Sequence, residues 1–141
     1  MSKETHNKIV AKLDRLDEYL GYLADVQTAN EKDFVKDYHL YGLAERYLQL
    51  SIEVLLDVGK LLVILARARR PEDNQDVFVS LHEKEILSEE LANRLLGIAN
   101  FRNILVHEYE DIDRSIVFSR LQKNMDDFRS FKSEVATYLA K

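Results

Sequence analysis

The sequence is poor in residues that many other folds and several kinds of site require. It has no cysteine, one proline and four glycines among its 141 residues. The missing thiols exclude disulfides, thiolate metal sites and a cysteine nucleophile. A fold of many strands needs more turn residues than these, whereas 46% apolar and 32% charged residues are typical of a globular chain. We therefore expect an all-α fold in one domain that spans residues 1–141.

Long apolar runs are also missing. The longest unbroken one, Leu61 to Ala66, is far shorter than the roughly 20 residues that cross a bilayer as a helix. The first 20 residues are charged and amphipathic and contain no apolar signal-peptide core. We therefore expect a cytoplasmic protein that does not act at a membrane.

The chain has no excess of positive charge. Its 20 Lys and Arg residues face 25 Asp and Glu residues, a formal net charge of −5. This argues against a surface built broadly for nucleic acid, although it leaves room for a local basic cleft. The four histidines show no zinc-site spacing and no glycine-rich phosphate loop is present, so we expect neither a metal nor a cofactor.

Apolar residues recur every three or four positions in five stretches, the spacing of an amphipathic helix. The stretches cover about 2–29, 31–70, 77–81, 88–105 and 113–138. Gly42 is the expected place for a bend in the second, and Pro71 prevents its continuation. Ser88 and Asp113 suit helix N-caps. Short connections between the stretches predict an antiparallel bundle of about five helices.

A line of polar residues crosses the most apolar of these helices. Its members stand at i, i+4 spacing and share one face; they are Glu45, Gln49, Glu53 and Asp57. Two interpretations are open. The favoured one is a solvated face, and the other is an acidic wall that faces a basic group on another helix.

Arg102 breaks the apolar pattern of the fourth helix. On a helical wheel that starts at Leu91, with about 100° per residue, Arg102 falls in the middle of the apolar stripe. A guanidinium keeps its proton, and burying it without a partner costs several kcal/mol. Arg102 must therefore pair with a carboxylate such as that of Glu53, or open onto a cleft or a subunit interface where it can bind an anion.

Asn103 and His107 are four residues apart and share a helix face, so the amide can orient the imidazole. His107 lies about 140° around the helix from Arg102, and one ideal helix cannot aim both at one phosphate. Either the helix unwinds near Val106 or a second copy of the chain completes the site. We favour the second explanation and expect a homodimer. The apolar arc available for it includes Ala92, Leu96, Ala99 and Val106.

Residues 101–109 read FRNILVHEY, in which Arg-Asn is followed by His after three residues and by Tyr two residues later. This string resembles the motif of HEPN ribonucleases, and its longer form is similar to that of HepT toxins from type VII-like toxin–antitoxin pairs. The resemblance covers essentially the whole chain, including Ile52-Glu53 upstream and the acidic residues 110–113 downstream. It implies a metal-independent endoribonuclease that cleaves RNA as a homodimer.

The resemblance also implies roles for single residues. Arg102 would bind the scissile phosphate and stabilise charge in the transition state. His107 would move protons as general acid or base, and Asn103 would support it. The implied partner is a minimal nucleotidyltransferase antitoxin that transfers AMP to Tyr109 and so blocks the site.

A second class of function stays open beside the nuclease. In it the chain is a non-catalytic binding subunit of a two-component minimal nucleotidyltransferase, and the cleft between Arg102 and His107 holds a nucleotide or braces a dimer. The negative net charge favours this alternative slightly, and the complete motif favours the nuclease.

Overall fold

The computed structural model describes residues 2–107 and 111–141. These residues form seven helices and no strand: α1 (Ser2–Gln27), α2 (Glu31–Lys36), α3 (Tyr38–Leu65), α4 (Asp76–Glu83), α5 (Glu89–Arg94), α6 (Ile98–His107) and α7 (Arg114–Leu139). The predicted all-α fold is confirmed. None of the helices in this part of the chain is both long and apolar enough to span a bilayer.

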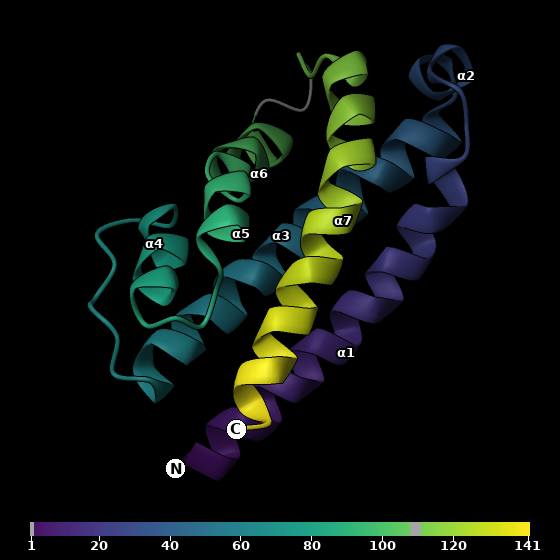
Figure 1. Ribbon diagram of the computed structural model, residues 1–141. Coiled ribbons are helices and arrows are strands. Elements are labelled where there is room, and N and C mark those ends of the chain that lie inside the picture. Colours follow the sequence, from purple (N-terminus) through teal and green to yellow (C-terminus); the bar gives the residue numbers. More distant parts are fainter. Residues whose placement is uncertain (1, 108–110) are drawn as a thin grey trace.

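Helix α3 is the central element of the bundle. It contacts α1, α2, α4, α6 and α7. Figure 1 shows α1 lying along it, α7 crossing it at an angle, and α4, α5 and α6 together at one flank. Its inward residues from Leu48 to Val63 are buried on several sides, because this stretch is apolar over most of its circumference. The stretch from Leu48 to Val63 therefore lies at the centre of the bundle.

The second predicted helix, 31–70, is two helices, and the break is at Asp37 rather than at Gly42. The Asp37 carboxylate accepts a hydrogen bond from the backbone N–H of His39 at 2.9 Å. This caps a new helix at its first turn, whereas Gly42 lies inside α3. The helix also ends at Leu65, before the arginines at positions 67, 69 and 70. The difference arises because a short polar side chain starts a helix more effectively than a glycine bends one.

The fourth predicted helix, 88–105, is also two. Ser88 caps α5 as expected, since its hydroxyl accepts the N–H of Leu91 at 3.1 Å. Gly97 then adopts φ +87°, a left-handed conformation that favours glycine, and α6 begins at Ile98. The wheel that starts at Leu91 therefore does not carry through to Arg102. The predicted cap at Asp113 is confirmed, because its carboxylate accepts the N–H of Ser115 at 2.9 Å.

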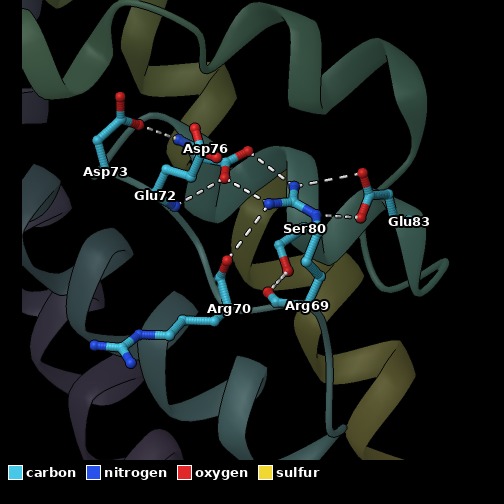
Figure 2. A network of polar contacts seen from close by, with 7 residues as sticks. All are labelled: Arg69, Arg70, Glu72, Asp73, Asp76, Ser80 and Glu83. Atoms are coloured by element: carbon cyan, nitrogen blue, oxygen red, sulfur yellow. Dashed lines mark hydrogen bonds and ion pairs between the residues drawn. The ribbon is translucent and has the colours of Figure 1, made fainter.

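A polar network fastens α4 to the segment that leaves α3 (Figure 2). The Arg69 guanidinium lies 2.7 Å from an Asp76 carboxylate oxygen and 2.9 Å from one of Glu83. Asp76 also accepts the N–H of Glu72 at 2.9 Å, and the Ser80 hydroxyl donates to the Arg69 carbonyl. The hydrogen bonds from Arg69 and Glu72 lower the pKa of Asp76 to about 2. Arg69 thus holds α4 in place.

Candidate functional site

Arg102 is held between two helices by a carboxylate and an amide. Its Nε donates to Glu53 Oε2 of α3 at 3.2 Å, and its Nη1 donates to Asn103 Oδ1 at 3.2 Å. Ile98, Phe101 and Leu105 are buried on the inner face of α6. Arg102 directly follows Phe101 and lies at the edge of that face, next to α3. Of the two alternatives left open for Arg102, the structure shows the carboxylate partner, and it is Glu53.

The ion pair is only partly withdrawn from solvent. The side chain of Arg102 is 29% exposed and that of Glu53 is 31% exposed. An anion can therefore still reach the guanidinium, while the two hydrogen bonds fix its plane. A partly exposed arginine with a fixed orientation is suited to binding a phosphate through its remaining N–H groups.

The polar line on α3 faces basic groups on two other helices. Gln49 Nε2 donates to the same Glu53 oxygen at 3.0 Å, and one turn further on Asp57 lies 3.4 Å from Lys12 Nζ of α1. The less favoured interpretation, an acidic wall opposite a basic group, is therefore confirmed at Glu53. The expectation of a wholly solvated face is wrong, because α6 covers the middle of the line.

The first member of the line, Glu45, lies close to a second arginine. Its Oε2 is buried without a hydrogen-bond partner in the described chain; burial raises the pKa of Glu45, against the lowering effect of Arg114. The Arg114 guanidinium lies over the Tyr41 ring, 3.9 Å from its centroid. Sequence reasoning missed Arg114. The available signal was a positive charge in the first turn of a helix, where the helix dipole disfavours it.

Asn103 and His107 lie on the exposed face of α6. The helix continues through His107, so the proposed unwinding near Val106 is wrong. The structure brings Arg102 and Asn103 together, and within the described residues it places no hydrogen bond between Arg102 and His107. Tyr109 lies outside the described residues.

Only part of the apolar arc expected at a dimer interface, Ala92, Leu96, Ala99 and Val106, is exposed to solvent. Ala92 is 5% exposed and Ala99 is 4% exposed, because both pack inside the chain, so their assignment to an interface is wrong. Leu96 is 45% exposed and Val106 is partly exposed. The surface available beside the motif is therefore narrower and more polar than the sequence indicated.

A further groove is lined by residues of α5 and α7. It has a volume of about 710 Å³ and lies between the end of α5 and the first half of α7. Its cations are partly engaged: Arg94 pairs with the buried Asp127 at 2.8 Å, and Arg120 lies over the Phe101 ring, 5.2 Å from its centroid. Lys123 adds a third positive charge. No cluster of three potential metal ligands occurs in residues 2–107 and 111–141.

Comparison with known proteins gives one family and several similar folds. A family model described as ribonuclease HepT-like matches residues 11–135. The tRNA nuclease HepT of Aphanizomenon flos-aquae is 26% identical over 131 residues, which cover 93% of this chain and 89% of that protein. The mRNA nuclease HepT of Shewanella oneidensis is 26% identical over 98 residues, 70% of this chain and 74% of that one.

Two solved structures have closely similar folds. The cytosolic protein of unknown function YutE from Bacillus subtilis has a TM-score of 0.81 and 21% identity, over 95% of this chain and 90% of that one. The tri-AMPylated Shewanella oneidensis HEPN toxin in complex with MNT antitoxin has a TM-score of 0.82 and 22% identity, over 92% and 96% of the two chains. At this identity the likeness bears on the fold.

Proposed function

This chain belongs to the HepT-like ribonuclease family, and on that premise we propose that it is an RNA-cleaving toxin whose catalytic centre is the motif on α6. The observation that carries the proposal is Arg102, which is held in one orientation by Glu53 and Asn103 and yet is partly open to solvent. A buried structural arginine would have its guanidinium fully enclosed. This one has an edge left for a substrate.

Arg102 binds the scissile phosphate and stabilises the negative charge that builds up on its oxygens in the transition state. Because Glu53 fixes the Nε edge, the guanidinium is oriented before RNA arrives, and little reorganisation is needed during the reaction. The Glu53 carboxylate lowers the net positive charge at the site, so selectivity for the phosphate comes from the remaining N–H groups.

His107 moves the protons. As general base it takes the proton of the ribose 2′-hydroxyl, whose oxygen then attacks phosphorus; as general acid it gives a proton to the leaving 5′-oxygen. Neither step needs a metal ion. The exposed position of His107 at the end of α6 leaves it accessible to a nucleotide, and Asn103, one turn earlier on the same face, orients the imidazole.

A homodimer completes the site. Arg102 and His107 diverge by about 140° on one straight helix, and α6 is helical at both positions. A two-fold axis beside α6 brings Arg102 of one copy opposite His107 of the other. Leu96 and Val106 supply apolar contact area on this side.

The partner is a minimal nucleotidyltransferase encoded beside this chain, and it silences the nuclease at Tyr109. The similar Shewanella toxin has a structure described as tri-AMPylated and in complex with an MNT antitoxin. In the transfer the tyrosine oxygen attacks the α-phosphorus of ATP, pyrophosphate leaves and the phenolic proton is lost. The new phosphodiester introduces a negative charge two residues after His107, where it competes with RNA for Arg102.

The alternative is a non-catalytic subunit, and the Glu53–Arg102 ion pair favours it, since a carboxylate already occupies one edge of the guanidinium. One experiment separates the two functions. The purified chain is incubated with total RNA in the presence of EDTA, and the products are sized. The nuclease produces discrete fragments, and Arg102→Ala does not. A chain that binds the nucleotidyltransferase tightly but leaves all RNA intact would support the alternative.

A further inference from the structure

The C-terminal end of α3 carries a small basic pocket with an apolar floor. We call it the α3-end pocket; its volume is about 430 Å³ and its lining is Lys60, Val63, Ile64, Arg67, Ala68, Arg70 and Pro71. Three of these residues are cations and none is acidic. Ile64 is 66% exposed, which is unusual for a large apolar side chain on the most buried helix. A positive, partly apolar surface is thus present on a chain of net charge −5.

The cations of this pocket do not hold the fold together. Arg69, in the same run, is the arginine bound to Asp76 and Glu83, and Figure 2 shows the Arg70 side chain pointing away from that network. Within the part of the chain that the structure describes, the side chains of Lys60, Arg67 and Arg70 form no ion pair. Their charges therefore remain available to a partner.

The backbone at Arg67 supports a role for its side chain. Arg67 has φ 54°, and the N–H of Ala68 reaches back to the Val63 carbonyl at 2.9 Å. This is the C-terminal helix motif in which glycine is the usual residue, because an L side chain is strained there. An arginine at this position carries a conformational cost, and within the described residues its side chain forms no hydrogen bond or ion pair that offsets it. Such strain is commonly found at functional surfaces.

We propose that the α3-end pocket is a docking site for the partner nucleotidyltransferase, and that it takes a segment of that protein in which carboxylates flank an apolar side chain. The inference rests on the proposed function. Three cations around an apolar floor complement such a segment in charge and in polarity. A single RNA strand fits less well, because no aromatic ring lines the pocket for base stacking.

The position of the pocket suits docking rather than catalysis. Ile64 is eleven residues after Glu53 on the continuous helix α3, roughly 16 Å along its axis at 1.5 Å per residue. A partner whose segment fills the pocket does not place that segment on Arg102. It can therefore stay attached while its own active site reaches the motif tyrosine.

The test is the affinity of the purified full chain for the purified nucleotidyltransferase, measured by titration calorimetry. The double variant Lys60→Glu/Arg70→Glu reverses two charges at the pocket, and we expect its affinity to fall by about tenfold or more. Arg46→Glu is the matched control, since Arg46 is an exposed cation near the other end of the same helix, and its affinity should change by less than about twofold. Binding of the wild type should weaken as salt is raised.

Arg67→Gly separates docking from folding. Glycine removes the cation and relieves the backbone, so this variant should melt at a higher temperature and yet bind more weakly. If it and the double variant bind as tightly as the wild type, the pocket is not the docking site, although the partner assignment stands. If the wild type itself does not bind the nucleotidyltransferase, the proposed partner and this inference both fail.

Two further outcomes overturn the proposal. RNA cleavage is measured for the double variant without the nucleotidyltransferase, and we expect the wild-type rate. A fall in that rate would assign the pocket to RNA. Sedimentation of the same variant should match the wild type, and a change of mass would assign the pocket to contacts between copies of this chain.

Discussion

Arg102 depends on Glu53 for its orientation. The two side chains meet at 3.2 Å between α6 and α3, and Gln49 holds the same carboxylate oxygen at 3.0 Å. Without Glu53 the guanidinium is free to swing toward solvent. In the proposed nuclease, the residues that support catalysis therefore include Glu53 of α3 as well as those of the motif.

Glu53→Ala tests this dependence. Misplacement of a catalytic group by about 1 Å can cost two orders of magnitude, so we expect RNA cleavage to slow by roughly 10- to 100-fold with the fold intact. Glu53→Gln keeps an acceptor for Arg102 Nε, so its rate of RNA cleavage should lie between those of the wild type and Glu53→Ala. Asp57→Ala is the control, because Asp57 stands one turn further along the same line and pairs with Lys12. Equal loss in the control would mean that the helix, and not the ion pair, is what matters.

Left-handed backbone at Arg67 and Gly97 predicts opposite changes in the free energy of unfolding when these two residues are replaced. Arg67 has φ 54° and Gly97 has φ +87°, and left-handed backbone costs an L residue about 1–2 kcal/mol. Arg67→Gly should therefore raise the free energy of unfolding by up to about 1 kcal/mol, and Gly97→Ala should lower it by a similar amount. Arg120 Nη2 is 4.0 Å from the added Cβ, so space is not the obstacle. Denaturant unfolding of both variants measures the difference.

At the scale of helices, the long periodic elements could be predicted and their interruptions could not. The apolar spacing of 2–29 and 113–138 predicted α1 and α7 closely, since burial of one stripe decides both. The breaks at Asp37 and Gly97 depend on one hydrogen bond and one positive φ angle. Neither break changes the spacing of apolar residues, because the helices on both sides of it bury an apolar face.

The candidate site divides in the same way. The motif indicates Arg102, Asn103 and His107, whose catalytic roles stay a prediction, and the cost of an unpaired guanidinium gave a carboxylate partner as one of two alternatives for Arg102. The position of Arg114 beside Glu45 could not be read from spacing, because it depends on how α7 approaches α3. Contacts between elements distant in sequence are set by packing, which periodicity alone does not describe.

The attachment of α4 to the end of α3 should depend on pH. Hydrogen bonds from Arg69 and Glu72 lower the pKa of Asp76 from 3.8 in the unfolded chain to about 2 in the fold. The network therefore makes its full contribution to the stability of the folded chain above about pH 4, and this contribution is lost as the pH falls toward about 2. Asp76→Asn removes the titration. Its deficit in unfolding free energy relative to the wild type should be largest near neutral pH and shrink below pH 4; a deficit that stays constant would contradict this account.

At the scale of the whole molecule, the proposed catalytic site needs two copies of the chain. Each α6 has Arg102 at the edge that meets α3 and His107 on the exposed face, so in the proposed dimer one copy supplies half of each catalytic pair. A dimer of one Arg102→Ala chain and one His107→Ala chain then has one complete catalytic pair and one pair that lacks both groups. Half of the dimers in an equal mixture are of this kind if the chains exchange freely, and half of their sites are intact.

The most direct test is the RNA cleavage rate of Arg102→Ala and His107→Ala, each alone and mixed after exchange of subunits, in EDTA. Each variant alone should lose roughly 10²- to 10⁴-fold while keeping its helical content. The mixture should recover about a quarter of the wild-type rate, because one site in four is complete. A His107→Ala chain that cleaves RNA at the wild-type rate would contradict the central claim, and a mixture with no recovery would contradict the shared site.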